Sequence, residues 1–135
     1  MKLSSKGRYA VMALADMANF DETYPISLRD ISLRQNISLV YLEQLFLKLK
    51  KYKIVISVRG NKGGYILSKK PSEIRISDIL LAVEEKVKTI GCEKNSKQGC
   101  NGKSSKCITH NLWDELEDYI NAFFRNKSLE DLLKN

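Results

Sequence analysis

Long apolar runs are absent from this 135-residue chain. A helix needs about 18 consecutive apolar residues to cross a membrane, and no stretch of the sequence approaches that length. The N-terminal stretch MKLSSKGRYAVMALADM starts with basic residues, but Asp16 interrupts its apolar part and no cleavage site follows. We therefore expect a helix of the mature protein rather than a signal peptide, no membrane partner, and a cytoplasmic location.

Acidic residues are missing between Lys48 and Lys70, a stretch that carries eight Lys and Arg residues. The imbalance extends over residues 1–75, which carry fourteen Lys and Arg against six Asp and Glu, whereas residues 76–135 carry nine against ten. A basic part joined to a nearly neutral part is typical of a polyanion-binding module with a separate regulatory or assembly region. A solvated face that keeps the protein soluble is the other interpretation that the composition leaves open.

Only two prolines occur, and both lie between elements that the pattern predicts. Apolar side chains surround most of residues 5–20, which indicates a helix that is buried on more than one side. Ser27 and Ser38 are expected to cap two further helices, of which the second is the longer. The β-branched stretch 54–58 and the partner strand YIL flank the turn RGNKGG, whose glycines suit a tight hairpin.

Three helices followed by a hairpin are the order of a winged helix-turn-helix, so the expected fold class is mainly α (α+β). A small α+β domain of another kind would show the same pattern. The basic residues favour the winged helix because they fall on the third helix and on the hairpin, the parts that touch DNA in that arrangement. We therefore expect double-stranded DNA as the partner of residues 1–75.

The helix that follows Ser38 has two distinct faces. Its core stripe is made of Leu42, Leu45, Phe46 and Leu49. On the opposite face Gln44 suits an adenine edge and Glu43 suits the amino group of cytosine, while Arg59 in the hairpin turn can enter a narrow minor groove. A solvated helix face and a merely soluble turn are the alternatives. The predicted DNA-contacting residues are Ser38, Val40, Glu43, Gln44, Lys48, Lys51, Arg59 and Lys62.

Two more helices are predicted after residue 75. The first covers residues 76–87 with Ser77 as its N-cap, and the second follows Asn111 as its N-cap, with Asp114 and Glu115 in its first turn. An apolar seam runs along this second helix, made of Leu112, Leu116, Tyr119, Ile120 and Phe123 and widened by Trp113 and Phe124. A second copy of the chain is the simplest partner for such a seam, so we expect a homodimer that binds a pseudo-palindromic operator.

Cysteine and histidine are rare and clustered, since all three cysteines and the only histidine lie in the stretch CEKNSKQGCNGKSSKCITH. Where thiols stay reduced, such a cluster more often binds metal than forms disulfides, and an odd number suits a three-thiolate set. Zinc sites usually have C-x2-C pairs, which are absent, although three cysteines and one histidine remain a legitimate zinc set. The wide spacing favours a larger, sulfide-bridged cofactor. The predicted ligands are Cys92, Cys100, Cys107 and His110.

Three stretches carry a resemblance to a known family: KLSSKGRYAVMALADMA, YLEQLFLKLKKYKIVISVRGNKGGYIL and the stretch with the cysteines and the histidine. Over nearly the whole chain they resemble the IscR/NsrR family of bacterial winged-helix transcription regulators, and the iron–sulfur cluster regulators within it. The resemblance implies a homodimer that binds a [2Fe–2S] cluster and controls iron–sulfur assembly genes. Carried over by position, the three cysteines and His110 are cluster ligands, and Glu43, Gln44 and Arg59 contact DNA.

We therefore expect a winged helix-turn-helix DNA-binding domain over residues 1–75, and a cluster-binding loop with a dimerisation helix over residues 76–135. The C-x2-H ending of the ligand pattern matches the iron–sulfur regulators of the family, whereas the two intervals between cysteines are longer here. The type of cluster is therefore left open by the spacing.

Other functions compete with this prediction. One is a regulator of the same family that responds to nitric oxide or iron. Another is a zinc-stabilised winged-helix DNA-binding protein, whose cysteine stretch would be structural. An enzyme is the third, with Cys107 as nucleophile and His110 as base, but no orienting group or substrate pocket accompanies the pair. We therefore expect a protein that is not an enzyme.

Overall fold

The computed structural model describes residues 3–20, 24–87 and 108–133. Its elements are the helices α1 (Ser5–Ala18), α2 (Leu28–Gln35) and α3 (Leu39–Lys51), the strands β1 (Val55–Val58) and β2 (Gly64–Leu67), the 3-10 helix η1 (Pro71–Glu73), and the helices α4 (Ile76–Ala82), α5 (His110–Arg125) and α6 (Leu129–Leu133). The predicted order of three helices and a hairpin is confirmed. Within the described ranges, no helix is long and apolar enough to cross a membrane.

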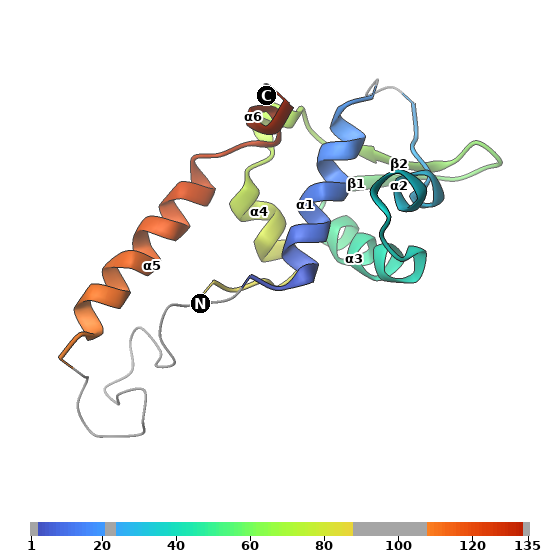
Figure 1. Cartoon of the computed structure of the whole chain (residues 1–135). Coiled ribbons are helices and arrows are strands. Elements are labelled where there is room, and N and C mark those ends of the chain that lie inside the picture. Colours follow the sequence, from blue (N-terminus) through green and yellow to red (C-terminus); the bar gives the residue numbers. More distant parts are fainter. Residues whose placement is uncertain (1–2, 21–23, 88–107, 134–135) are drawn as a thin grey trace.

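Helix α1 occupies the middle of the molecule. It contacts α2, α3, α4, α6 and β2, so neighbours surround it on several sides (Figure 1). The predicted burial on more than one side is confirmed, because Ala10, Ala13 and Leu14 are fully buried. Val11 and Ala15 on the same helix are only half-buried.

A partly buried ion pair joins α1 to α2. The Arg34 guanidinium donates from Nε to Asp16 Oδ1 at 3.0 Å and from Nη2 to Asp16 Oδ2 at 2.7 Å, and Gln35 Nε2 donates to Oδ1 at 2.9 Å. The hydrogen bond to Asp16 raises the pKa of Arg34. A buried carboxylate is tolerable when charged and polar donors satisfy it in this way. The contact therefore fixes how α2 sits against α1.

Helices α2 and α3 form the helix-turn-helix, and both predicted caps are confirmed. The Ser27 hydroxyl accepts a hydrogen bond from the Asp30 N–H at 3.1 Å, and the Ser38 hydroxyl accepts one from the Tyr41 N–H at 3.4 Å. Between the helices Asn36 adopts a left-handed conformation with φ of 55°, which turns the chain sharply. The predicted core stripe of α3 is also confirmed, since all four of its residues are buried: Leu42, Leu45, Phe46 and Leu49.

The hairpin is tied to the segment that precedes α2. Strands β1 and β2 pair antiparallel, with Val55 opposite Leu67 and Val58 opposite Gly64. The backbones of Ile26 and Tyr65 exchange two further hydrogen bonds of 2.9 and 2.8 Å. A Cβ on Gly64 would lie 2.3 Å from the Ile26 carbonyl oxygen, so only glycine allows this close approach. The hairpin is therefore held to the helix-turn-helix at its base.

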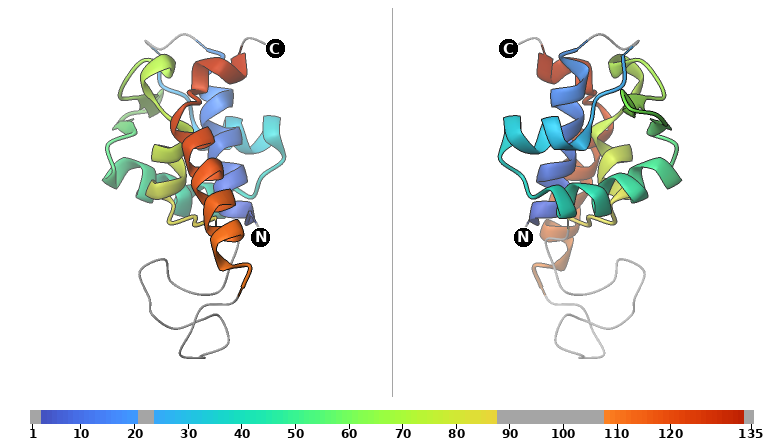
Figure 2. Two further views of the ribbon diagram at one scale, coloured as in Figure 1. Left: turned by 90° about the vertical axis from the view of Figure 1, so that its left-hand side faces the viewer. Right: turned by 90° about the vertical axis from the view of Figure 1, so that its right-hand side faces the viewer.

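The elements after residue 75 share the same core. Ile76, Ile79 and Leu129 are buried with the apolar residues of α1 and α3. The Ile76 N–H donates to the Lys127 carbonyl at 2.9 Å, and the Leu129 N–H donates to the Ile74 carbonyl at 3.0 Å. Helix α5 lies on the outside, where it contacts α4, and the chain then returns to α6 beside α1 (Figure 2). One hydrophobic core thus includes residues from both sides of position 75.

Both predicted N-caps in this part are wrong. Helix α4 begins at Ile76 with Arg75 as its N-cap, not Ser77, because Asp78 Oδ2 accepts the Arg75 N–H at 3.3 Å. It ends at Ala82, well before residue 87. Helix α5 begins at His110 with Thr109 in the N-cap position, not Asn111. Its first turn consequently contains no acidic residue, and Asp114 and Glu115 lie further along the helix.

Candidate nucleic-acid interface and metal-binding residues

The outward face of α3 brings together the residues that the sequence predicted to contact DNA. Val40 is 64% exposed and Leu47 is 66% exposed, although both are large apolar residues. Glu43, Gln44 and Lys51 are exposed around them. Apolar side chains held in water among polar ones suit a surface that meets another molecule, and thymine methyl groups are apolar partners in a major groove.

Helix α3 is fixed in position on its inward side and at its first turn. The Tyr41 ring packs edge-on against Tyr9 with 5.8 Å between ring centroids, and the Tyr41 and Ser5 hydroxyls are 3.1 Å apart. Phe46 packs on Tyr65 of the hairpin at 5.0 Å between centroids. These contacts connect α3 to α1 and to β2. The outward face is thus presented by a rigid element, as precise recognition requires.

The lysines of α3 lie in its last turn. Lys48, Lys50 and Lys51 are all near the C-terminal end of the helix, where positive charge interacts favourably with the helix dipole. Lys51 is exposed, whereas Lys48 is partly covered and its Nζ lies 3.5 Å from Oε2 of Glu84, which follows α4. The two lysines therefore have different surroundings: Lys48 is partly covered beside a carboxylate, whereas Lys51 is exposed.

The hairpin tip carries the remaining predicted DNA contacts. Arg59 and Lys62 are both exposed, and they lie in the turn between β1 and β2. The Gly63 N–H donates to the Gly60 carbonyl at 3.0 Å, which closes the turn, and Gly60 has a left-handed φ of 119°. The hairpin projects outward past α2 and α3 (Figure 1), so its tip is accessible to a ligand as long as DNA.

Of the predicted metal ligands, only His110 lies in the described part of the chain. It is the first residue of α5 and is 8% exposed, at the point where the cysteine-containing stretch reaches the helix. Cys92, Cys100 and Cys107 lie outside the described residues. Among residues that the structure describes, no group of three His, Cys, Asp or Glu is placed to hold a metal ion. Three thiolates and one imidazole nevertheless suit an iron–sulfur cluster chemically.

A buried carboxylate oxygen lies close to His110 along the helix. Asp114 follows one turn later on the same side of α5, and its buried Oδ1 has no hydrogen-bond partner among the residues that the structure describes. A buried acceptor of this kind lacks a donor, which is unfavourable unless another group supplies one. Histidine ligands of metals usually donate their second ring N–H to such an acceptor. The donor set and this acceptor together fit a metal site at the start of α5.

Two contacts of the turn after α4 could not be found by sequence reasoning. Glu84 and Glu85 follow α4, and the sequence pattern had assigned both to a longer helix. In the structure Glu84 reaches Lys48, and Glu85 Oε1 and Oε2 accept from the Ser4 hydroxyl at 2.7 and 2.8 Å. Both contacts join residues that are distant in the sequence, and no local spacing indicates them.

Comparison with known proteins identifies a consistent set of relatives. A family model described as Rrf2, iron-dependent transcriptional regulator, matches residues 3–135. The HTH-type transcriptional regulator IscR of Photorhabdus laumondii is 48% identical over 135 residues, which are 100% of this chain and 80% of that protein. The structure of T. potens IscR has a TM-score of 0.78 at 34% identity and covers 99% of this chain and 87% of its own.

A second solved structure is similar without being an IscR. CymR (YrzC), the global cysteine regulator of B. subtilis, has a TM-score of 0.80 at 30% identity and covers 98% of this chain and 95% of its own. These similarities confirm the predicted winged-helix fold, the resemblance to the IscR/NsrR family and the role in transcription regulation.

Substitutions on α3 distinguish a residue that contacts bases from one that contacts phosphates. Gln44→Ala should weaken binding to a selected operator by roughly 1–3 kcal/mol and leave random DNA nearly unchanged, because a base contact acts only at its own site. Lys51→Ala should weaken both DNAs alike and reduce the slope of log affinity against log salt by about one unit. Titrations of both duplexes over a salt series measure these effects. Equal losses on the two DNAs for Gln44→Ala would remove it from the base-contacting set.

Proposed function

Because this chain belongs to the Rrf2 family of transcriptional regulators, we propose that it senses a [2Fe–2S] cluster and controls genes of iron–sulfur cluster assembly. Like its relatives, it is a helix-turn-helix transcription regulator and not an enzyme. The observation that carries the proposal is that one short chain combines an exposed face of α3, with polar and apolar side chains suited to a DNA groove, and a set of three cysteines and a histidine.

We propose that α3 enters the major groove and that the hairpin tip approaches the minor groove. The exposed positions of Val40, Glu43, Gln44 and Leu47 support contacts of α3 with base edges. Ser38 at the helix start, Lys48 and Lys51 suit phosphates, as do Arg59 and Lys62 at the hairpin tip. A helix-turn-helix dimer of this kind places two such helices about one turn of DNA apart, which favours a pseudo-palindromic operator.

We propose that the parts of the chain before and after residue 75 have different functions. Residues 1–75 contain α1 to α3 and the hairpin, and they would bind DNA. Residues 76–135 contain the ligand set and α5, and they would bind the cluster and the second copy. Because the two parts share one core, a change in the second part has a direct mechanical route to the first.

Cys92, Cys100, Cys107 and His110 would hold the cluster, which when bound supplies a centre that accepts or releases an electron. The chain contributes two features to it. The imidazole of His110 is a neutral ligand, so the site carries less negative charge than one with four thiolates. His110 is also the first residue of α5 and is buried there.

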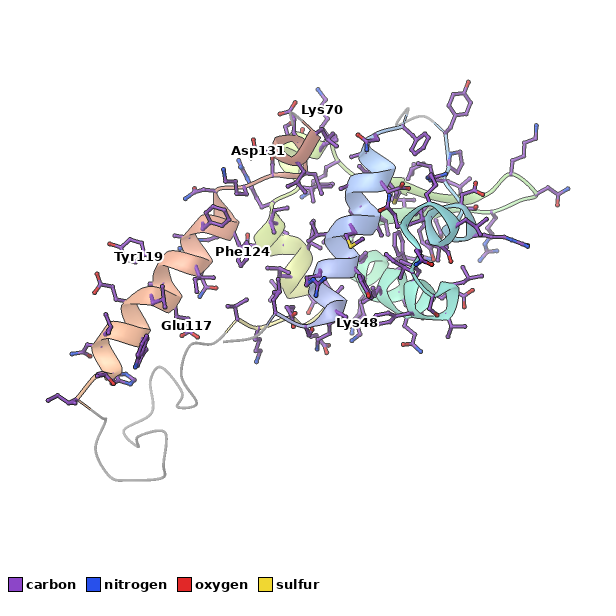
Figure 3. All side chains as sticks on the ribbon, viewed as in Figure 1. Lys48, Lys70, Glu117, Tyr119, Phe124 and Asp131 are labelled. Carbon is purple, nitrogen blue, oxygen red and sulfur yellow. The ribbon has the colours of Figure 1, made fainter. Side chains whose placement is uncertain are left out.

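A homodimer is supported by the exposed apolar face of α5. Tyr119 is 67% exposed and Phe123 is 57% exposed, and Leu112 and Leu116 lie on the same face. Figure 3 shows Tyr119 pointing away from the body. The face continues into a groove of about 460 Å³ between α1, α4, α5 and α6, lined mainly by apolar side chains that include Val11 and Leu132. Apolar surface of this extent is typical of a protein–protein interface.

A zinc-stabilised regulator is the second candidate. Three thiolates and one imidazole suit a zinc ion as well as they suit an iron–sulfur cluster. A nitric-oxide- or iron-responsive regulator of the same family is a further one. The three candidates share the DNA-binding surface and differ in the metal content and its chemistry.

Metal analysis distinguishes the first two candidates. Protein purified without oxygen should be coloured and contain iron and acid-labile sulfide in about equal amounts, and replacing Cys92, Cys100 or Cys107 by Ser should abolish both. His110→Cys should retain a cluster but lower its reduction potential, because another anionic ligand disfavours the added electron. Stoichiometric zinc from cells supplied with both metals would contradict the cluster proposal, and an unchanged potential would remove His110 from the ligand set.

Charge placed on the exposed face of α5 tests the dimer. Leu116→Asp together with Phe123→Asp should give a folded monomer, because both side chains are exposed in the protomer and only dimerisation would bury the new charges. Sedimentation or light scattering gives the mass, and circular dichroism reports the fold. Asn111→Asp, an exposed position on another side of the same helix, is the control and should remain dimeric. A soluble dimer with both Asp residues would place the interface elsewhere.

A further inference from the structure

The end of α4 carries a glutamate where helices usually have glycine. Glu84 has a left-handed φ of 61°. Its N–H donates to the Leu81 carbonyl at 3.1 Å, and the Glu85 N–H donates to the Leu80 carbonyl at 2.8 Å, which is the Schellman arrangement. Glycine adopts this conformation without strain, whereas a residue with a Cβ is strained there. A strained residue of this kind is a candidate for a functional role.

The Glu84 side chain extends to α3. Its Oε2 lies 3.5 Å from Lys48 Nζ, and the two side chains are 67% and 42% exposed. The left-handed backbone determines this direction, because it turns the chain back at the end of α4. The strained position therefore places a carboxylate beside one of the lysines proposed to bind phosphate.

The neighbouring residue anchors the turn to the body. The Glu85 carboxylate accepts hydrogen bonds from the Ser4 hydroxyl and the Ser4 N–H at the N-cap of α1. A Cβ on Gly7 would lie 2.8 Å from Glu85 Cγ, so glycine at this position leaves room for the carboxylate to approach. Because Glu85 is held in this way, Glu84 is kept in a defined place relative to α3.

We propose that Glu84 is an internal competitor for Lys48 and lowers the affinity of the protein for DNA. The inference rests on the proposed contact of Lys48 with phosphate. In the unbound protein the Lys48 ammonium has the Glu84 carboxylate as its partner, so binding exchanges one anionic partner for another and gains less. Glu84 thus sets the strength of the sequence-independent part of DNA binding.

The test uses the full chain, in one state of metal loading throughout, and a duplex of random sequence. Glu84→Gln should strengthen binding about two- to fivefold at low salt, the range expected for exposed ion pairs, and the gain should shrink as salt rises. In a Lys48→Ala background the same substitution should change affinity by less than about 1.5-fold, because its partner is missing. Glu73→Gln removes the same charge from the exposed surface of η1 and should leave the affinity within that limit.

Glu84→Gly distinguishes the effect of the strained backbone on stability from the effect of the carboxylate on DNA binding. It should strengthen DNA binding as much as Glu84→Gln does, and it should also raise the melting temperature because the strain is removed. An unchanged affinity for Glu84→Gln would overturn the inference, as would a gain that appears only with Gly or that survives in the Lys48→Ala background. If Lys48→Ala alone leaves DNA binding unchanged, the proposed DNA contact of Lys48 fails instead, and the inference fails with it.

Discussion

The packing of other elements around α1 is the constraint on which the rest of the structure depends. The helix-turn-helix, the hairpin, α4 and α6 all contact it. Close contact on several sides requires small side chains, and Ala10 and Ala13 are fully buried. The buried Asp16 fixes the orientation of α2 on α1, because its carboxylate accepts hydrogen bonds from two side chains of α2. A larger residue at either alanine would force apart elements that must meet for α3 to be held in place.

The first turn of α1 also contacts both α3 and the turn that follows α4. The Ser5 hydroxyl lies 3.1 Å from that of Tyr41 on α3, and the Ser4 hydroxyl donates to Glu85 after α4. The carboxylate of Glu84, the residue before Glu85, lies 3.5 Å from the Lys48 ammonium group. Helix α3, which we propose to bind DNA, and the turn after α4 therefore meet at one small region. A regulator needs such a contact. A change at the sensor alters DNA binding only through an element whose conformation depends on both the sensor and the bound DNA.

The elements of residues 1–75 could be predicted from local patterns, because their determinants are local. Ser27 and Ser38 cap their helices through bonds to residues close in sequence, and the stripe of α3 follows the helical period. The α4 cap could not be predicted. Ser77 is a good N-cap type, but Ile76 is buried and its N–H donates to Lys127, so a distant contact starts the helix earlier.

The candidate site also contains residues that local patterns predict and residues whose placement depends on tertiary contacts. The outward face of α3 follows from helical geometry, and the exposure of Val40, Glu43, Gln44 and Leu47 agrees with it. The Glu84–Lys48 pair could not be predicted, because it depends on a left-handed glutamate that no propensity favours. The start of α5 also depends on tertiary structure, since His110 is buried and begins the helix ahead of the better capping residue Asn111.

The central claim is that the outward face of α3 determines which DNA sequence is bound, and Glu43 tests it most directly. A carboxylate facing DNA is repelled by phosphate unless it accepts a hydrogen bond from a base. Selection of binding sites from a random pool should therefore give a narrow set for the native protein. For Glu43→Ala it should give a broader set, with one base position relaxed and stronger binding to random DNA. Identical site preferences for the two proteins would contradict the account.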